Sequence, residues 1–172
     1  MAGVTRSPVQ GTRVTRNPRL RPSWVRLVRE HDPTQMEPVY IRGPADVHSF
    51  LHRRATQELG EVFYCLTLNG RSRVVSCQEV TRGTLNSSLV HPREVFRLAI
   101  AEGAAGIIVA HNHPSGDPTP SADDRAVTRQ LVDAGRLLDI PVYDHVIIAD
   151  GQYVSFAEAG LLLGVQRSNK EG

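Results

Sequence analysis

The sequence contains few of the residues and segments that define several large classes of protein. Among its 172 residues there are only two cysteines, Cys65 and Cys77, which excludes a disulfide framework and a metal site built from four thiolates. The longest uncharged apolar stretch, Ala104 to Ala110, is far shorter than the roughly 20 residues of a membrane-spanning helix. We therefore expect a cytoplasmic protein, in a reducing compartment, with no membrane segment.

Acidic residues are absent from the first part of the chain. Residues 1–29 contain seven arginines and no aspartate or glutamate, so in a chain of net charge +2 the remainder has an excess of about five negative charges. Prolines interleaved with these arginines discourage a continuous basic helix. Two interpretations of this arm remain open, a solvated disordered leader or a segment that contacts the phosphates of DNA.

The composition divides the chain into three parts. Residues 1–35 form the Arg/Pro-rich arm, residues 36–165 are expected to form one globular domain, and residues 166–172 form a polar tail. A length of 172 residues with 40% hydrophobic residues suits a single domain with one sizeable core.

Hydrophobic periodicity and turn residues predict an α/β fold, in which a mixed sheet is packed against helices. The predicted strands are Pro38–Ile41, Glu61–Asn69, Ser72–Val80, Ala105–Ala110 and Val142–Ala149, of which the second and third form a hairpin around Asn69-Gly70. The predicted helices are Ala45–Leu59, a segment from His91-Pro92 to about Glu102, Ser121 to about Leu138, and Phe156–Leu163.

The segment that follows the buried strand Ala105–Ala110 carries the candidate chemistry. If the extended geometry continues through His111-Asn112-His113, the two imidazoles leave the strand on the same face, because residues two apart in a strand do so. Asp124 lies one turn into the next helix, so the loop between can bring its carboxylate to the same point. Two nitrogens and one oxygen leave a fourth tetrahedral position for water, which is typical of a catalytic rather than a structural zinc site.

Two further residues are candidates for the reaction itself. Hydrolysis needs a base that takes a proton from water and returns it to the leaving group, and Glu61, before an apolar strand, is the candidate. Ser121 is a candidate donor of a hydrogen bond to the oxyanion that forms on a substrate carbonyl. Ser121 and Asp124 also have the spacing of a helix capping box, and this interpretation is compatible with the metal site.

The string HNHPSGDPTPSADD, together with the upstream Glu61, resembles the JAMM motif of MPN-type metalloproteases, and in detail their RadC-type branch. The motif elements are Glu61, His111, His113, Pro114, Ser121 and Asp124, with ten residues between the second histidine and the aspartate. The similarity extends through GTLNSS at residues 83–88, HPRE at 91–94 and DHVII at 144–148, and covers about residues 37 to 164.

This resemblance implies a cytidine-deaminase-like (JAB/MPN) α/β fold and a zinc metallopeptidase that cleaves an amide or isopeptide bond in a protein or peptide. It implies one Zn²⁺ per chain bound by His111, His113 and Asp124, with Glu61 as the general acid and base and Ser121 assisting the oxyanion. Longer members of the branch carry an N-terminal helical domain associated with DNA, where this sequence has the Arg/Pro arm. A DNA-associated protein with a non-peptidase metal site is therefore the alternative function.

Three other sequence patterns bear on these functions. A nucleoside deaminase would need His-x-Glu and Pro-Cys-x-x-Cys, and neither is present. Cys65 and Cys77 fall on the two arms of the predicted hairpin and are interpreted as small core residues. Asp144-His145 is either a hydrogen-bonding pair that orients a metal ligand or merely a pair of strand residues.

Overall fold

The computed structural model describes residues 37–83 and 90–162, so the predicted arm (1–35) and tail (166–172) lie outside the described residues. The elements within them are α1 (Pro44–Ala55), β1 (Val62–Leu68), β2 (Val74–Arg82), α2 (Pro92–Glu102), β3 (Gly106–Asn112), α3 (Ala122–Leu138), β4 (Val142–Ala149) and β5 (Gln152–Ser155). The fold is α/β, as predicted.

The strands form one mixed sheet in the order β2-β1-β3-β4-β5. Neighbouring strands are antiparallel except β3 and β4, which pair in parallel with His111 opposite Ile147. Parallel neighbours need a crossover connection, and α3 forms the one between β3 and β4. Strands β1 and β3 are buried along their whole length, because both faces of the sheet are covered there.

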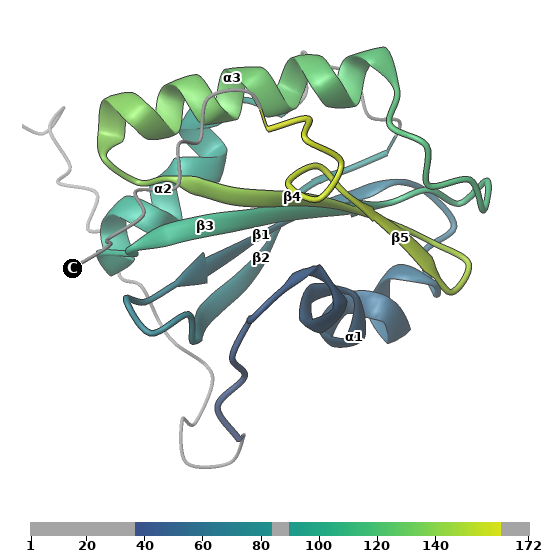
Figure 1. Cartoon of the computed structure of the whole chain (residues 1–172), viewed down its shortest axis with the longest axis horizontal. Coiled ribbons are helices and arrows are strands. Elements are labelled where there is room, and N and C mark those ends of the chain that lie inside the picture. Colours follow the sequence, from purple (N-terminus) through teal and green to yellow (C-terminus); the bar gives the residue numbers. More distant parts are fainter. Residues whose placement is uncertain (1–36, 84–89, 163–172) are drawn as a thin grey trace, which may run out of the picture. The chain divides into compact units, whose positions relative to one another are not determined.

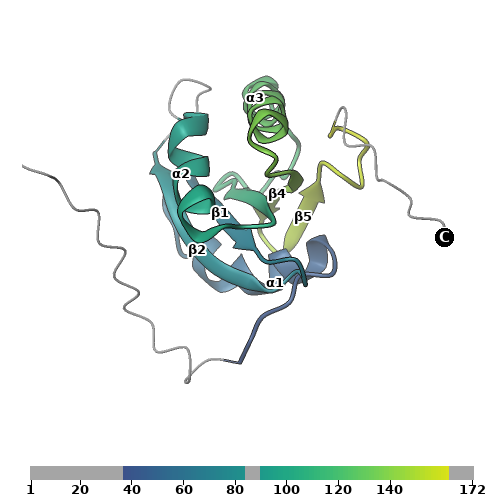
Figure 2. The same ribbon diagram turned by 90° about the vertical axis from the view of Figure 1, so that its left-hand side faces the viewer.

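The helices cover both faces of this sheet. Helices α2 and α3 lie on one face and α1 lies on the other (Figures 1 and 2). The core between the sheet and the α2/α3 layer includes Phe63, Val95, Phe96, Val109 and Leu131. The core on the α1 side includes Val47, Leu51, Tyr64, Leu66 and Val146. Burial of a large apolar side chain stabilises the fold by about 1.5–3 kcal/mol, so these two cores hold the central strands in place.

The predicted starts of two helices are confirmed, and each has a capping side chain. The His91 ring accepts a hydrogen bond from the Arg93 N–H, with Pro92 at the first helical position of α2. At the start of α3, the Ser121 hydroxyl accepts from the Asp124 N–H and the Asp124 carboxylate accepts from the Ser121 N–H, which is a capping box. No helix in the described ranges has the length and apolar character needed to cross a membrane.

The hairpin is confirmed, but its turn is longer than Asn69-Gly70. Strands β1 and β2 pair in antiparallel fashion, and the turn between them extends from Asn69 to Arg73. The Asn69 side-chain oxygen accepts hydrogen bonds from the N–H groups of Arg71 and Arg73, which holds the longer turn together. The strand predicted at Pro38–Ile41 is reduced to a single bridge between Tyr40 and Arg73.

Two helix predictions were wrong in their extent or type. Helix α1 ends at Ala55 rather than Leu59, because the hydroxyl of Thr56 binds the His52 carbonyl and the chain then leaves the helix. Leu59 is fully exposed and packs in no core.

Residues Phe156–Gly160 form a turn where a helix was predicted, and Leu163 lies outside the described residues. The Asp144 carboxylate and the Ser155 hydroxyl accept from the N–H groups of Ala157 and Glu158, as at the start of a helix. Gly160, at φ 67°, then ends the segment after one turn, with the Leu161 N–H bound to the Phe156 carbonyl. Strand β5 (Gln152–Ser155), just before this turn, was not predicted.

Candidate metal centre

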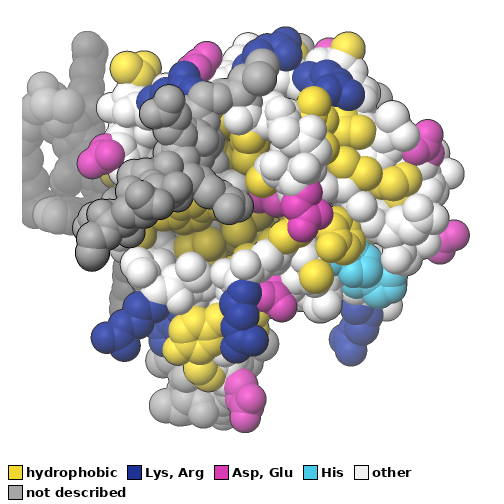
Figure 3. Space-filling view, in the orientation of Figure 1, with side chains coloured by type: hydrophobic (Ala, Val, Ile, Leu, Met, Phe, Trp, Pro, Cys, Tyr) yellow, Lys and Arg dark blue, Asp and Glu magenta, His cyan; other side chains and the backbone are white. Residues whose placement is uncertain are grey.

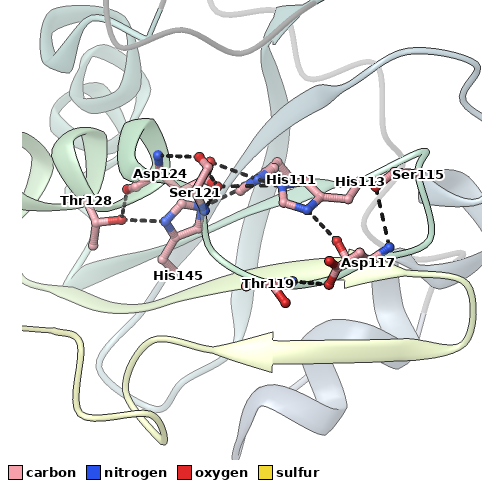
Figure 4. Close-up of polar contacts among 9 residues, drawn as sticks. All are labelled: His111, His113, Ser115, Asp117, Thr119, Ser121, Asp124, Thr128 and His145. Atoms are coloured by element: carbon pink, nitrogen blue, oxygen red, sulfur yellow. Dashed lines mark hydrogen bonds and ion pairs between the residues drawn. The ribbon is translucent and has the colours of Figure 1, made fainter.

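The side chains of His111, His113 and Asp124 meet at one point (Figure 4). Strand β3 continues through Asn112, so the two imidazoles leave it on the same face as predicted. Their Nε2 atoms are 2.9 Å apart. Asp124 Oδ1 lies 3.1 Å from His111 Nε2, and Asp124 Oδ2 lies 3.6 Å from His113 Nε2.

These distances fit a small divalent cation. Bonds of 2.0–2.1 Å in a tetrahedron place ligand atoms roughly 3.3 Å apart. The two Nε2 atoms at 2.9 Å, and His111 Nε2 and Asp124 Oδ1 at 3.1 Å, lie close to that value. Two imidazole nitrogens and one carboxylate oxygen form a donor set that transition metals such as zinc prefer. The three residues could therefore hold one metal ion.

Burial and mutual contact set the charge states of the three residues. Burial lowers the pKa of His111, and this outweighs the raising effects of Asp124 and Glu61. Contact with the Asp124 carboxylate raises the pKa of His113, which is only partly buried. Burial alone would raise the pKa of Asp124, but the two imidazoles beside its carboxylate lower it well below its usual range. The group is thus an ionised carboxylate facing two imidazoles.

The capping box at the start of α3 also orients the Asp124 carboxylate. Oδ2 accepts hydrogen bonds from the Ser121 N–H at 2.7 Å and from the Ser121 hydroxyl at 2.6 Å. Oδ1 is the atom nearer to His111. The structure therefore joins the capping and metal-site interpretations in one side chain. The Ser121 hydroxyl proton is directed at Asp124, and its oxyanion role stays a prediction.

The loop after β3 fixes the ring of His113. His113 Nδ1 lies 2.7 Å from the backbone carbonyl oxygen of Asp117, which can only accept a hydrogen bond. The Asp117 carboxylate in turn accepts from the Thr119 N–H and so stabilises the turn that presents this carbonyl. The contact at Nδ1 therefore fixes the orientation of the His113 ring, with Nε2 directed at the other two candidate ligands (Figure 4).

The predicted pair Asp144-His145 is present, but only His145 contacts a ligand. His145 Nε2 lies 2.8 Å from His111 Nδ1, and the His145 ring is fully buried between Phe63 and Phe156. Burial lowers the pKa of His145 well below its usual value. The Asp144 carboxylate binds the N–H groups of His145 and Ala157, so it anchors the turn after β5 rather than the metal site.

Glu61 stands at the point where β1 and β3 separate. The last pair of their ladder is Phe63 with His111, and Glu61 precedes Phe63 by two residues, just before the start of β1. The Glu61 carboxylate contributes to the charges that raise the pKa of His113, after the larger effect of Asp124. Glu61 thus lies on the side of the sheet edge where the three candidate ligands meet, and its role in proton transfer stays a prediction.

The buried side chain of Asn112 holds the segment that carries Glu61. Its Oδ1 accepts a hydrogen bond from the Val62 N–H at 2.8 Å, and its Nδ2 donates one to the Gly60 carbonyl at 3.1 Å. These two bonds bracket Glu61 and replace the backbone ladder where the strands diverge. Asn112 lies between the two histidines in sequence but works on the opposite face of the strand.

Sequence reasoning did not find the roles of Asn112, Thr128 and the Asp117 carbonyl. Thr128 contacts His145 and lies four residues after Asp124, so its position on the same face of α3 was a usable signal. The contacts of Asn112 and the Asp117 carbonyl depend on the register of β1 with β3 and on the loop conformation, which the sequence pattern does not specify.

The cysteines take no part in this site. Burial raises the pKa of Cys65 to about 12 and that of Cys77 to about 11, so both are protonated at neutral pH. Cys65 belongs to the core under α2 and α3, and Cys77 packs against the core on the α1 side. Their interpretation as small core residues is confirmed.

Comparison with known proteins supports the same picture. The family described as "RadC-like JAB domain" matches residues 41–161, which is more than half of the chain. The chain belongs to this family. The domain therefore has the JAB/MPN fold, and its three converging side chains could hold a metal ion.

Several curated relatives are known only as UPF0758 proteins. The RadC-like domain is 50% identical over 119 residues to one from Trichlorobacter lovleyi, covering 69% of this chain and 52% of the relative. It is 50% identical over 126 residues to one from Symbiobacterium thermophilum, covering 73% and 54%. It is 45% identical over 127 residues to one from Listeria monocytogenes, covering 74% and 57%. The chain thus spans about half the length of the curated relatives that it matches.

Proposed function

We propose that this RadC-like JAB domain is a zinc-dependent hydrolase that cleaves an amide or isopeptide bond in a protein or peptide. The observation that carries the proposal is the convergence of the His111, His113 and Asp124 side chains, with Glu61 just before β1 and close enough for its charge to act on both histidines. Three protein ligands leave a zinc ion with an open position, which is the arrangement of catalytic sites. We propose a cytoplasmic location for this activity.

The protein's own residues divide the work of hydrolysis. Bound zinc would act as a Lewis acid, polarising the substrate carbonyl and making water a stronger nucleophile. Glu61 takes the proton from the attacking water and passes it to the nitrogen of the leaving amine, so that the bond between carbon and nitrogen breaks. Asn112 keeps Glu61 at the sheet edge during both transfers. Ser121 orients Asp124 and is the nearest candidate donor to an oxyanion.

A cleft beside His113 is the proposed place for a part of the substrate chain away from the cleaved bond, since His113 is the one candidate ligand in its lining. It has a volume of about 380 Å³ and lies between the end of α1, the loop after β3 and the end of β4. Its lining includes Leu59, Asn112, His113, Gly116 and Asp150. Leu59 lines this cleft and is fully exposed, so it is available to contact an apolar part of a substrate chain.

The proposal is tested with a mixture of peptides derived from a whole proteome. The zinc-loaded protein is expected to produce new peptide N-termini, detected by mass spectrometry, and the protein treated with a chelator is expected to produce none. Cleavage that persists after complete zinc removal would contradict a metal-dependent mechanism. No new termini from the zinc-loaded protein, in this mixture and in isopeptide-linked peptides, would contradict the hydrolase proposal itself.

A second candidate function, contact with DNA, is favoured by the seven arginines of residues 1–29. On the face shown in Figure 3, the Lys and Arg side chains of the described residues are scattered among acidic ones and form no continuous basic stripe. The proposal therefore depends on the arm, which lies outside the described residues.

Deletion of residues 1–29 is expected to abolish DNA binding by the full chain, because the arm supplies the charges that neutralise phosphates. For the full chain, the logarithm of the binding constant should fall linearly with the logarithm of the salt concentration. Each phosphate that the protein neutralises adds about −0.9 to the slope of that line. Fluorescence anisotropy with a labelled duplex at several salt concentrations measures both effects. Binding that is insensitive to salt, or equal in the truncated chain, would remove this candidate.

A further inference from the structure

A chain of three hydrogen bonds leads from helix α3 to the back of His111 (Figure 4). The Thr128 hydroxyl lies 2.6 Å from the backbone carbonyl oxygen of Asp124 and also 2.6 Å from His145 Nδ1. His145 Nε2 lies 2.8 Å from His111 Nδ1. Every member of this chain is buried. The acceptor at one end of the chain determines which atom donates in each of the three bonds.

The carbonyl end sets the direction of the first two bonds. A backbone carbonyl oxygen can only accept, so the single hydroxyl proton of Thr128 is directed at Asp124. The Thr128 oxygen therefore has only lone pairs to offer His145. It follows that His145 Nδ1 carries a proton and donates it to Thr128.

The proton on His145 Nδ1 in turn determines which nitrogen of His111 carries a proton. His145 is enclosed by the rings of Phe63 and Phe156, and it is fully buried, so the neutral ring with one N–H is the form that this site accommodates. With its proton on Nδ1, His145 has an acceptor at Nε2. His111 Nδ1 must then be the donor, and His111 Nε2 retains its lone pair.

His113 reaches the same state by a shorter route. Its Nδ1 donates to the Asp117 carbonyl, so its Nε2 carries a lone pair when the ring is neutral. With both rings neutral, the two Nε2 atoms and Asp124 Oδ1 direct lone pairs at one point. Both histidines are thus oriented by a backbone carbonyl, His113 directly and His111 through two intermediate side chains.

We propose that Thr128 and His145 are positioning residues that transmit the acceptor character of the Asp124 carbonyl to His111 and thereby keep its Nε2 available for a metal ion. Asp124 would then act twice in the site, with its carboxylate as a ligand and with its carbonyl as the origin of the hydrogen-bond chain. The inference rests on the metal site of the proposed function, but it does not depend on hydrolysis.

The first test uses the wild-type protein without metal. Long-range ¹H–¹⁵N spectra of the histidine rings at mildly alkaline pH distinguish a protonated from an unprotonated ring nitrogen. We expect His111 and His145 both to be protonated at Nδ1 and unprotonated at Nε2. A proton on Nε2 of either ring would overturn the proposal, and this result requires neither zinc binding nor a substrate.

The second test compares Thr128→Val with Thr128→Ser. Valine keeps the shape of the side chain but removes the acceptor for His145 Nδ1, so His145 is expected to move its proton to Nε2 and force His111 to do the same. Zinc affinity, measured by competition with a chromophoric chelator, should fall about 10- to 100-fold, the range found when the outer partners of a ligand are lost. Serine retains the hydroxyl and should retain both the affinity and the wild-type ring spectrum.

The outcomes separate this proposal from the hydrolase proposal. Equal zinc affinities for the valine, serine and wild-type proteins would overturn the role of Thr128. If Thr128→Val fails to fold, the ring spectrum of the wild type still decides the direction of the chain. A zinc-binding protein with the expected spectrum that cleaves no peptide would leave this inference standing and remove the hydrolase.

Discussion

Replacement of Glu61 by glutamine is expected to reduce peptide cleavage by about 10²- to 10⁴-fold while the affinity for zinc remains that of the wild type. Glutamine has nearly the same shape as glutamate but cannot take a proton from water at neutral pH. The three candidate metal ligands come from β3 and α3, and Asn112 binds only the backbone on either side of residue 61. The substitution therefore removes the base and leaves the rest of the site in place.

The measurement compares the rate at which new N-termini appear with the zinc content of the same samples. Glu94→Gln is a matched control, because Glu94 lies on α2, is half exposed and pairs with Arg93 and Arg97, none of which belongs to the candidate site. It should cleave as the wild type does. Wild-type rates in the Glu61→Gln protein would show that another group transfers the proton, and the proposed mechanism would be wrong.

Replacement of His113 by alanine is expected to weaken zinc binding by more than about 100-fold and to abolish cleavage. The loss of an outer partner of a ligand already costs 10- to 100-fold, and this change removes one of three direct ligands. His113 is suited to the test because it is less buried than His111, and its removal exposes less of the core. The fold should therefore survive, as circular dichroism would verify.

Zinc stoichiometry and affinity of the His113→Ala protein are read by mass spectrometry under native conditions and by chelator competition. His52→Ala serves as the control, since His52 lies on α1 and is not among the three converging ligands. One zinc ion per chain, bound with unchanged affinity in the His113→Ala protein, would show that the metal is held elsewhere.

The parts of the site that sequence could predict are those contained in one continuous segment. His111, His113 and Asp124 lie within a strand, a loop and the first turn of a helix, so local periodicity and capping signals were enough to bring them together. The contact of His145 with His111 depends instead on the parallel register of β3 with β4. A shift in that register between Ile107 and Ile108 has no signature in the sequence.

The two wrong helix predictions have different physical origins. Apolar spacing from Ala45 to Leu59 and from Phe156 to Leu163 suits a helix, but neither segment keeps helical hydrogen bonds to its end. At the end of α1 the Thr56 hydroxyl binds the His52 carbonyl, and the following amides bind carbonyls only three residues back. In the second segment Gly160, at φ 67°, ends the helical turn, and this glycine was a local signal that apolar spacing outweighed.

Two of the three candidate ligands belong to elements that pack in the core, since His111 lies near the end of β3 and Asp124 in the first turn of α3. A metal ion held there binds the folded chain and not the unfolded one. A higher concentration of free metal therefore shifts the folding equilibrium toward the folded chain. Free zinc at 100 times the dissociation constant would add about 2.7 kcal/mol to the free energy of unfolding. A cell deprived of zinc would thus hold a larger unfolded fraction of this protein, open to degradation by its proteases, and the protein's abundance would follow the metal's availability.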